Sequence, residues 1–135
     1  MNASLGMTLV TLVTTLAVIE VMVFGLLVGR GRIRYGVPAP AMTGHPAWER
    51  LNRVHLNSVE QVVVFVPLLW IFALTVSPIW AAVLGALFVV ARVAYAVGYA
   101  RDPEARAAGA ILTAFTQGIL GIGSLVGVVL RIIRT

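Results

Sequence analysis

The stretch ERLNRVHLNSVEQVVVF, residues 49–65, decides the fold because it changes from polar to apolar within a few helical turns. Its first thirteen positions carry charged, imidazole and amide side chains, whereas the chain from Val62 to Leu74 is almost entirely apolar. An apolar run of this kind, joined to a polar one, predicts a helix that enters a membrane and carries polar groups at one end.

The whole chain is too apolar for a soluble domain. Its 135 residues are 60% hydrophobic and 11% charged, whereas soluble domains contain roughly 25% charged residues. We therefore expect an integral membrane protein with a single domain, residues 1–135. The chain contains no cysteine, which excludes disulfides, thiolate metal sites and a cysteine nucleophile, and we expect no metal site of another kind.

Apolar runs and helix-breaking residues predict an all-α fold with four membrane-spanning helices, over residues 4–29, 51–76, 79–100 and 103–130. The first run is too long for a signal peptide and is interpreted as a retained span. Ser77 and Pro78 form a short turn, and Asp102 with Pro103 is typical of a helix start. The loop of residues 29–48 is rich in glycine and proline, so we expect it to be irregular.

Arginines predict how the helices are oriented. Seven of them fall on one side of the predicted membrane and two, Arg131 and Arg134, on the other. The seven are Arg30, Arg32, Arg34, Arg50, Arg53, Arg101 and Arg106. The positive-inside rule places the arginine-rich loops in the cytoplasm, and we expect the host membrane to be a bacterial inner membrane. This bias also accounts for the net charge of +5 without a nucleic-acid partner.

Polar side chains gather at the cytoplasmic ends of the predicted helices. One stripe of the second helix, with the spacing i, i+4, i+7, i+8, holds Arg53, Asn57, Glu60 and Gln61. One stripe of the third, with the spacing i, i+3, i+7, holds Arg92, Tyr95 and Tyr99. His55 lies near the same membrane edge, and Arg106 begins the fourth helix there. Several arginines around one carboxylate suit an anionic ligand.

Interfacial snorkelling and aromatic belts explain any one of these residues alone, but they explain the complete set less well, because charges inside membrane segments are costly and tend to be functional. Gln117 and the glycines of GILGIGSLVG, residues 118–127, are interpreted as helix-packing residues of the fourth span.

Two of these stretches resemble the signatures of the MAPEG family, the membrane-associated proteins in eicosanoid and glutathione metabolism. RVHLNSVEQ, residues 53–61, resembles the segment R-A-H-x-N-x-x-E, and ARVAYAVGYARDPEAR, residues 91–106, resembles A-R-x-x-Y-x-x-G-Y-x-x-x-x-x-x-R. The resemblance covers the four-span layout and implies a four-helix bundle that assembles as a homotrimer. It also implies that glutathione, as co-substrate, binds between neighbouring subunits at the cytoplasmic membrane edge.

The resemblance assigns roles by position. Arg53, Asn57 and Glu60 match residues that hold the tripeptide, and Arg92, Tyr95 and Tyr99 match the facing wall. Arg106 matches an arginine that stabilises the thiolate and is the expected catalytic residue. His55 stands where family members have His or Gln, and Arg32 is the expected further basic residue, with Arg30 and Arg34 left open by the repeated GRGRIR pattern. Gln61 departs from the tyrosine of one branch of the family.

These assignments predict a membrane-bound glutathione transferase, or a peroxidase, that attacks lipophilic electrophiles or lipid hydroperoxides arriving from the bilayer. A free thiol has a pKa of about 8.5, and a nearby cation lowers such a pKa by about 1 to 3. Two alternatives stay open: a non-catalytic lipid-binding trimer, and a small proton-coupled multidrug transporter that uses Glu20. We interpret Glu20 instead as an interhelical hydrogen-bonding residue, because a carboxyl group in mid-span requires a partner.

Overall fold

Four long helices make up almost all of the computed structural model, which describes residues 3–135. They are α1 (Ala3–Tyr35), α2 (Pro46–Thr75), α3 (Pro78–Arg101) and α4 (Ala107–Arg134), and a 3-10 turn, η1 (Pro103–Arg106), precedes α4. All four, with η1 counted as part of the last, are long and apolar enough to cross a membrane. The predicted all-α fold with four spans is confirmed.

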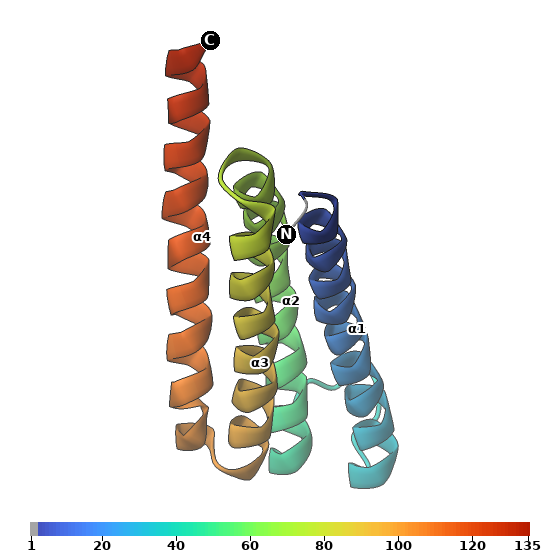
Figure 1. The fold of residues 1–135 in the computed structure, drawn as a ribbon. Helices are drawn as coiled ribbons and strands as arrows, with labels where there is room; N and C mark the ends of the chain where they lie inside the picture. The colour runs from blue at the N-terminus through green and yellow to red at the C-terminus, as the bar shows by residue number, and fades with distance from the viewer. Residues whose placement is uncertain (1–2) are drawn as a thin grey trace.

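The helices run alternately up and down, so that the beginning of α1 and the end of α4 lie at the same end of the bundle (Figure 1). Helices α2 and α3 occupy the middle, with α1 on one side and α4 on the other, and the last turns of α4 extend beyond the rest. Large apolar side chains remain exposed along the outer helices, such as Leu26 at 72% and Ile122 at 70%. These features describe an integral, multi-pass membrane protein.

Polar caps and prolines fix the helix starts, because a cap accepts a hydrogen bond from a free amide and proline has no amide to lose. The Trp80 amide donates to the Ser77 hydroxyl at 3.4 Å before α3. The Glu104 amide donates to Asp102 Oδ1 at 3.1 Å before η1. The turn at Ser77 and the cap at Asp102 are therefore both present, although the chain first makes a 3-10 turn and becomes α-helical only at Ala107.

The loop between α1 and α2 is shorter than the expected stretch of residues 29–48. Helix α1 continues to Tyr35, and α2 begins at Pro46. Gly36, with φ of +66°, ends α1, and the Val37 amide donates to the Arg32 carbonyl at 3.0 Å, a common way to close a helix C-terminus. The expectation of an irregular segment from residue 29 was wrong, because Gly29 and Gly31 lie within α1 and only Gly36 ends the helix.

Close packing brings α1, α2 and α3 together, with stacked aromatic rings between α2 and α3 and a glycine where α1 meets α3. The buried rings of Phe65 and Phe88 stack with their centres 3.7 Å apart. A Cβ on Gly85 would lie 2.5 Å from Val13 Cγ1, so only glycine allows α1 and α3 to approach this closely. Small residues at such crossings are typical of helix packing in membranes, and they fix the relative heights of the polar side chains described next.

Candidate active site

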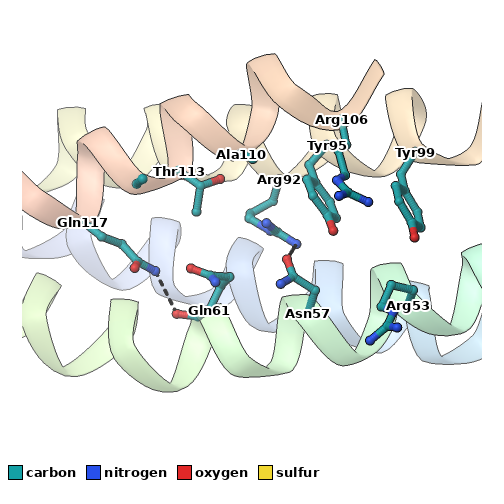
Figure 2. Close-up of a pocket in the computed structure, with 11 residues that line it drawn as sticks. Arg53, Asn57, Gln61, Arg92, Tyr95, Tyr99, Arg106, Ala110, Thr113 and Gln117 are labelled. Atoms are coloured by element: carbon teal, nitrogen blue, oxygen red, sulfur yellow. Dashed lines mark hydrogen bonds between the residues drawn. The ribbon is translucent and has the colours of Figure 1, made fainter. Parts of the chain in front are cut away.

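A cavity of about 670 Å³ opens between α2, α3 and the start of α4 (Figure 2). The side chains that line it come from one face of each helix: Arg53, Asn57, Gln61, Arg92, Tyr95, Tyr99, Arg106, Ala110, Thr113, Ala114 and Gln117. Both predicted stripes thus contribute to one cavity, together with the predicted arginine at the beginning of the last span. It lies in the half of the bundle nearest the α3–η1 connection.

Arg92 is the most deeply placed charge of the cavity, with only 2% of its surface exposed. Its Nη2 donates to Asn57 Oδ1 and to the Ser58 hydroxyl, each at 2.9 Å. Its guanidinium carbon lies 4.3 Å from the centre of the Tyr95 ring, a distance at which cation–π attraction is significant. Two α2 side chains and one α3 ring therefore hold this guanidinium in a fixed orientation.

Two stacked tyrosines form the cavity wall between Arg92 and the open end of the cavity. The rings of Tyr95 and Tyr99 lie 5.8 Å apart and almost parallel, and the guanidinium carbon of Arg106 lies 5.1 Å from the Tyr99 ring centre. Gly98 makes this possible, because a Cβ there would collide with the Ala105 carbonyl. The absence of a side chain lets η1 fold back on α3, which brings Arg106 over Tyr99.

A second glycine brings α4 against α3. A Cβ on Gly109 would collide with the backbone of Tyr95 and with the Ala91 carbonyl. On the far wall, Gln117 Nε2 donates to the Gln61 carbonyl at 3.1 Å and ties α4 to α2. Along α4, the cavity is therefore bounded by the close contact of Gly109 with α3 and, two turns further along the helix, by the hydrogen bond from Gln117 to α2.

The cavity is strongly cationic. Three arginines line it, and no lining residue is an aspartate or a glutamate. Arg53 and Arg106 are exposed at the open end, whereas Arg92 is buried. Cations around a partly enclosed space, with hydrogen-bond donors fixed in position, favour an anionic ligand.

Glu60 lies outside the cavity of a single chain, although it belongs to the predicted stripe. It is exposed, and its flanking side chains on that face, Leu56 and Val63, are also exposed, at 41% and 68%. The next residue, Gln61, lines the cavity instead. The reason is the rotation of α2, since one residue corresponds to about 100° around a helix.

His55 and Arg32 are also directed elsewhere. The imidazole of His55 packs on α1, where a Cβ on Gly25 would lie 3.2 Å from its Nε2. Arg32 Nη1 donates to the Ala41 carbonyl at 2.8 Å, and its guanidinium lies 4.3 Å from the centre of the Trp48 ring. Within one chain, then, Arg32 holds the α1–α2 loop closed. Arg30 and Arg34 are exposed at the same end of α1.

Ser58 and the α4 wall were absent from the predicted site. The sequence predicts a packing role for Gln117, yet this residue lines the cavity and also bonds to α2. A signal for this wall exists in the sequence, because its members repeat at i, i+4, i+7, i+8 and i+11 from Arg106. They are Ala110, Thr113, Ala114 and Gln117. Most of them are small and weakly polar, so composition did not distinguish them from packing residues.

Comparison with known proteins places this geometry in a family. The model of the MAPEG family matches residues 10–126. An uncharacterised protein of the cyanobacterium Synechocystis is 41% identical over 87% of this chain and 85% of its own length. Human microsomal glutathione S-transferase 2 is 33% identical over 88% of this chain and 79% of its own length. Bovine leukotriene C4 synthase is 34% identical over 71% of this chain and 64% of its own length.

Proposed function

The chain belongs to the MAPEG family, and we propose that it is a membrane-bound glutathione transferase that binds glutathione in the arginine-lined cavity. The relatives named for glutathione transfer and for leukotriene C4 synthesis support a glutathione-related membrane enzyme. The observation that carries the proposal is the cavity itself, in which three arginines and no carboxylate surround a space of about 670 Å³. Glutathione offers two carboxylates to such a site.

The buried and the exposed arginines suit different parts of the ligand. Arg92, oriented by Asn57 and Ser58, is suited to one glutathione carboxylate, and Arg53 at the open end to the other. Arg106 then stands over Tyr99, where its charge stabilises a thiolate. Arginine fits this role because it stays protonated at every working pH.

The chemistry needs only a cation and an approach path for the second substrate. Arg106 lowers the pKa of the bound thiol, the proton leaves to water, and the thiolate sulfur attacks the electrophilic carbon of a lipophilic molecule. The electron pair of the broken bond leaves with the departing group. With a lipid hydroperoxide the sulfur attacks the terminal peroxide oxygen, the O–O bond breaks, and the lipid alkoxide leaves and takes a proton to become the alcohol. The glutathione sulfenic acid that remains reacts with a second glutathione to give the disulfide and water.

We further propose that the enzyme is a homotrimer whose neighbouring subunit completes the site. Glu60 supports this arrangement, because it is exposed in one chain beside Leu56 and Val63, which suits a surface covered by another subunit. At that interface Glu60 would pair with the ammonium of a glutathione held by the neighbour. The arginine-rich end would face the cytoplasm of a bacterial inner membrane, following the positive-inside rule.

Two other functions are less well supported. A non-catalytic lipid-binding trimer does not need three arginines around one cavity, two of them over tyrosine rings. A proton-coupled transporter of cations that uses Glu20 is disfavoured, because three arginines line the cavity at the arginine-rich end of the bundle. A positive charge at that position opposes the binding of a cationic drug.

Equilibrium binding of glutathione to the purified protein in detergent tests the proposal. The variants are Arg53→Ala, Glu60→Ala and the double variant, with Arg101→Ala as control, because Arg101 is an exposed arginine at the same end that does not line the cavity. We expect micromolar-to-millimolar binding that the double variant loses and the control retains. Binding that is unchanged in the double variant contradicts the assigned site, and no binding to the intact protein contradicts the choice of thiol.

A further inference from the structure

Helices α1 and α3 run in parallel with a constant register. A Cβ on Gly6 would lie 3.0 Å from the side chain of Pro78, and a Cβ on Gly85 would lie 2.5 Å from Val13. Position 6 therefore meets 78, and position 13 meets 85, seven residues further along each helix. Two further turns in the same direction bring Glu20 level with Arg92, because both helices rise by the same amount per residue.

Both of these charged side chains have atoms that lack partners. Glu20 Oε1 and Arg92 Nε are buried, and neither has a hydrogen-bond partner among the described residues. The interhelical hydrogen bond expected of Glu20 is thus not made to its Oε1 within one chain. No direct ion pair joins them among the described residues, so the register of α1 and α3, which brings the two charges level, is the ground for an electrostatic interaction between them. Each lies within a membrane-spanning helix, where an uncompensated charge is costly.

Two negative groups could compete for Arg92: the Glu20 carboxylate on α1, which the helix register brings level with it, and an anionic ligand in the cavity. Arg92 Nη2 donates to Asn57 and Ser58 of α2, and both Arg92 and Asn57 line the cavity. Helix α1, which carries Glu20, contributes no residue to the lining of the cavity. We propose that Glu20 is the resident counter-ion of Arg92, a positioning residue with which a glutathione carboxylate competes for the guanidinium. This inference rests on the proposed function, because it identifies what regulates the anion affinity of that same site.

The sign of the effect follows from Coulomb's law. A negative charge behind Arg92 attracts the guanidinium and repels an anion in the cavity. Removing the charge without changing the side-chain shape leaves Arg92 uncompensated in the empty protein, which lowers stability. The same change strengthens glutathione binding, because the ligand then supplies the missing counter-charge. A residue that merely supported the fold would lower stability and weaken binding together.

Glutathione binding and thermal unfolding of the full-length protein in detergent test this opposition. Glu20→Gln is expected to lower the unfolding temperature while tightening glutathione binding about 3- to 10-fold. Glu20→Asp keeps the charge and is expected to restore wild-type behaviour. The control is Glu104→Gln, which removes the same charge from an exposed position on η1 and is expected to change neither quantity. Weaker or unchanged binding in Glu20→Gln overturns the proposal.

A double-mutant cycle with Arg92→Gln separates this inference from the proposed function. Without glutathione, the loss in unfolding temperature of the double variant should be smaller than the two single losses combined, as for groups in direct interaction. Additive losses overturn the pairing. If the intact protein binds no glutathione, the proposed function fails together with the competition, and this cycle still decides whether Glu20 and Arg92 are partners.

Discussion

The guanidinium of Arg106 lies over the ring of Tyr99, with its central carbon 5.1 Å from the ring centre. Arg106 follows Tyr99 by seven positions in the sequence, and the change of chain direction between α3 and η1 brings the two together. The ring limits where the guanidinium can move, so that the charge stays at the mouth of the cavity. A cation fixed at that position can act on a thiol without moving during the reaction.

Replacing Arg106 with glutamine should raise the pKa of the bound thiol, because the cation that favours the thiolate is lost. We expect the acidic limb of the pH–rate profile for conjugation to move to higher pH by about 1 to 3 pH units. Activity should therefore fall most at low pH and recover in part at high pH. Thiolate ultraviolet absorbance of the glutathione complex, measured across pH, checks the shift directly. An unchanged profile would show that another group activates the thiol.

Arg53 is exposed at the open end of the cavity, and its loss should affect binding rather than the reaction of the bound thiol. We expect Arg53→Ala to weaken glutathione binding about tenfold, in the range of a lost hydrogen bond to a charged group. The rate at saturating glutathione should change little. Steady-state kinetics with glutathione as the varied substrate provide the measurement. A large fall in the saturated rate would instead place Arg53 beside the reacting sulfur.

Gly109 should tolerate no larger residue, because a Cβ there collides with the backbone of Tyr95. Gly109→Ala is expected to destabilise the protein by about 1 to 3 kcal/mol, as overpacked cores do, and to weaken glutathione binding by pushing α4 away from α3. Gly118→Ala is the matched control on the same helix, since its Cβ meets no atom within 4 Å. Unfolding in micelles titrated with a denaturing detergent measures both. Equal effects of the two changes would disprove the packing argument.

Arg32 tests whether a predicted substrate ligand is instead a structural residue. Its guanidinium bonds to the Ala41 carbonyl and stacks on Trp48, so we expect Arg32→Gln to lower stability by about 1 to 3 kcal/mol. Glutathione affinity of the folded variant should stay within about twofold of wild type, well below the tenfold that one lost charged hydrogen bond represents. Calorimetric binding at a temperature below unfolding makes the comparison. A loss of affinity as large as that of Arg53→Ala would restore Arg32 to the site.

Co-expression of two variants tests the proposed homotrimer and its shared site. If Glu60 and Arg106 of different subunits serve one glutathione, then co-expressed Glu60→Ala and Arg106→Gln chains should form some sites with both groups intact. We expect such mixtures to show more activity than either variant alone, with separately purified and mixed trimers as the control. Activity no higher than the mean of the two variants would place both groups in the site of one chain.

The sequence by itself determined the four helices, the cap at Asp102, the turn at Ser77 and the residues of the cationic stripes. Long apolar runs, the cap at Asp102 and the turn at Ser77 are local signals, since each depends on residues within a few positions of one another. The family signatures are local in the same sense, and residues 53–61 and 91–106 contribute most of the cavity. The sequence did not predict that α1 continues to Tyr35, because Gly29, Gly31 and Gly36 lie close together and only the last of them ends the helix.

Only the tertiary structure decided which of the predicted site residues face the cavity. Gln61 rather than Glu60 lines it, and Arg32 turns to the loop, because the rotation of a helix about its axis is set by contacts with distant helices. The proposed pairing of Glu20 with Arg92 has the same origin. It depends on the height at which α1 meets α3, and that height is fixed where Val13 packs against Gly85, a contact that neither segment encodes alone.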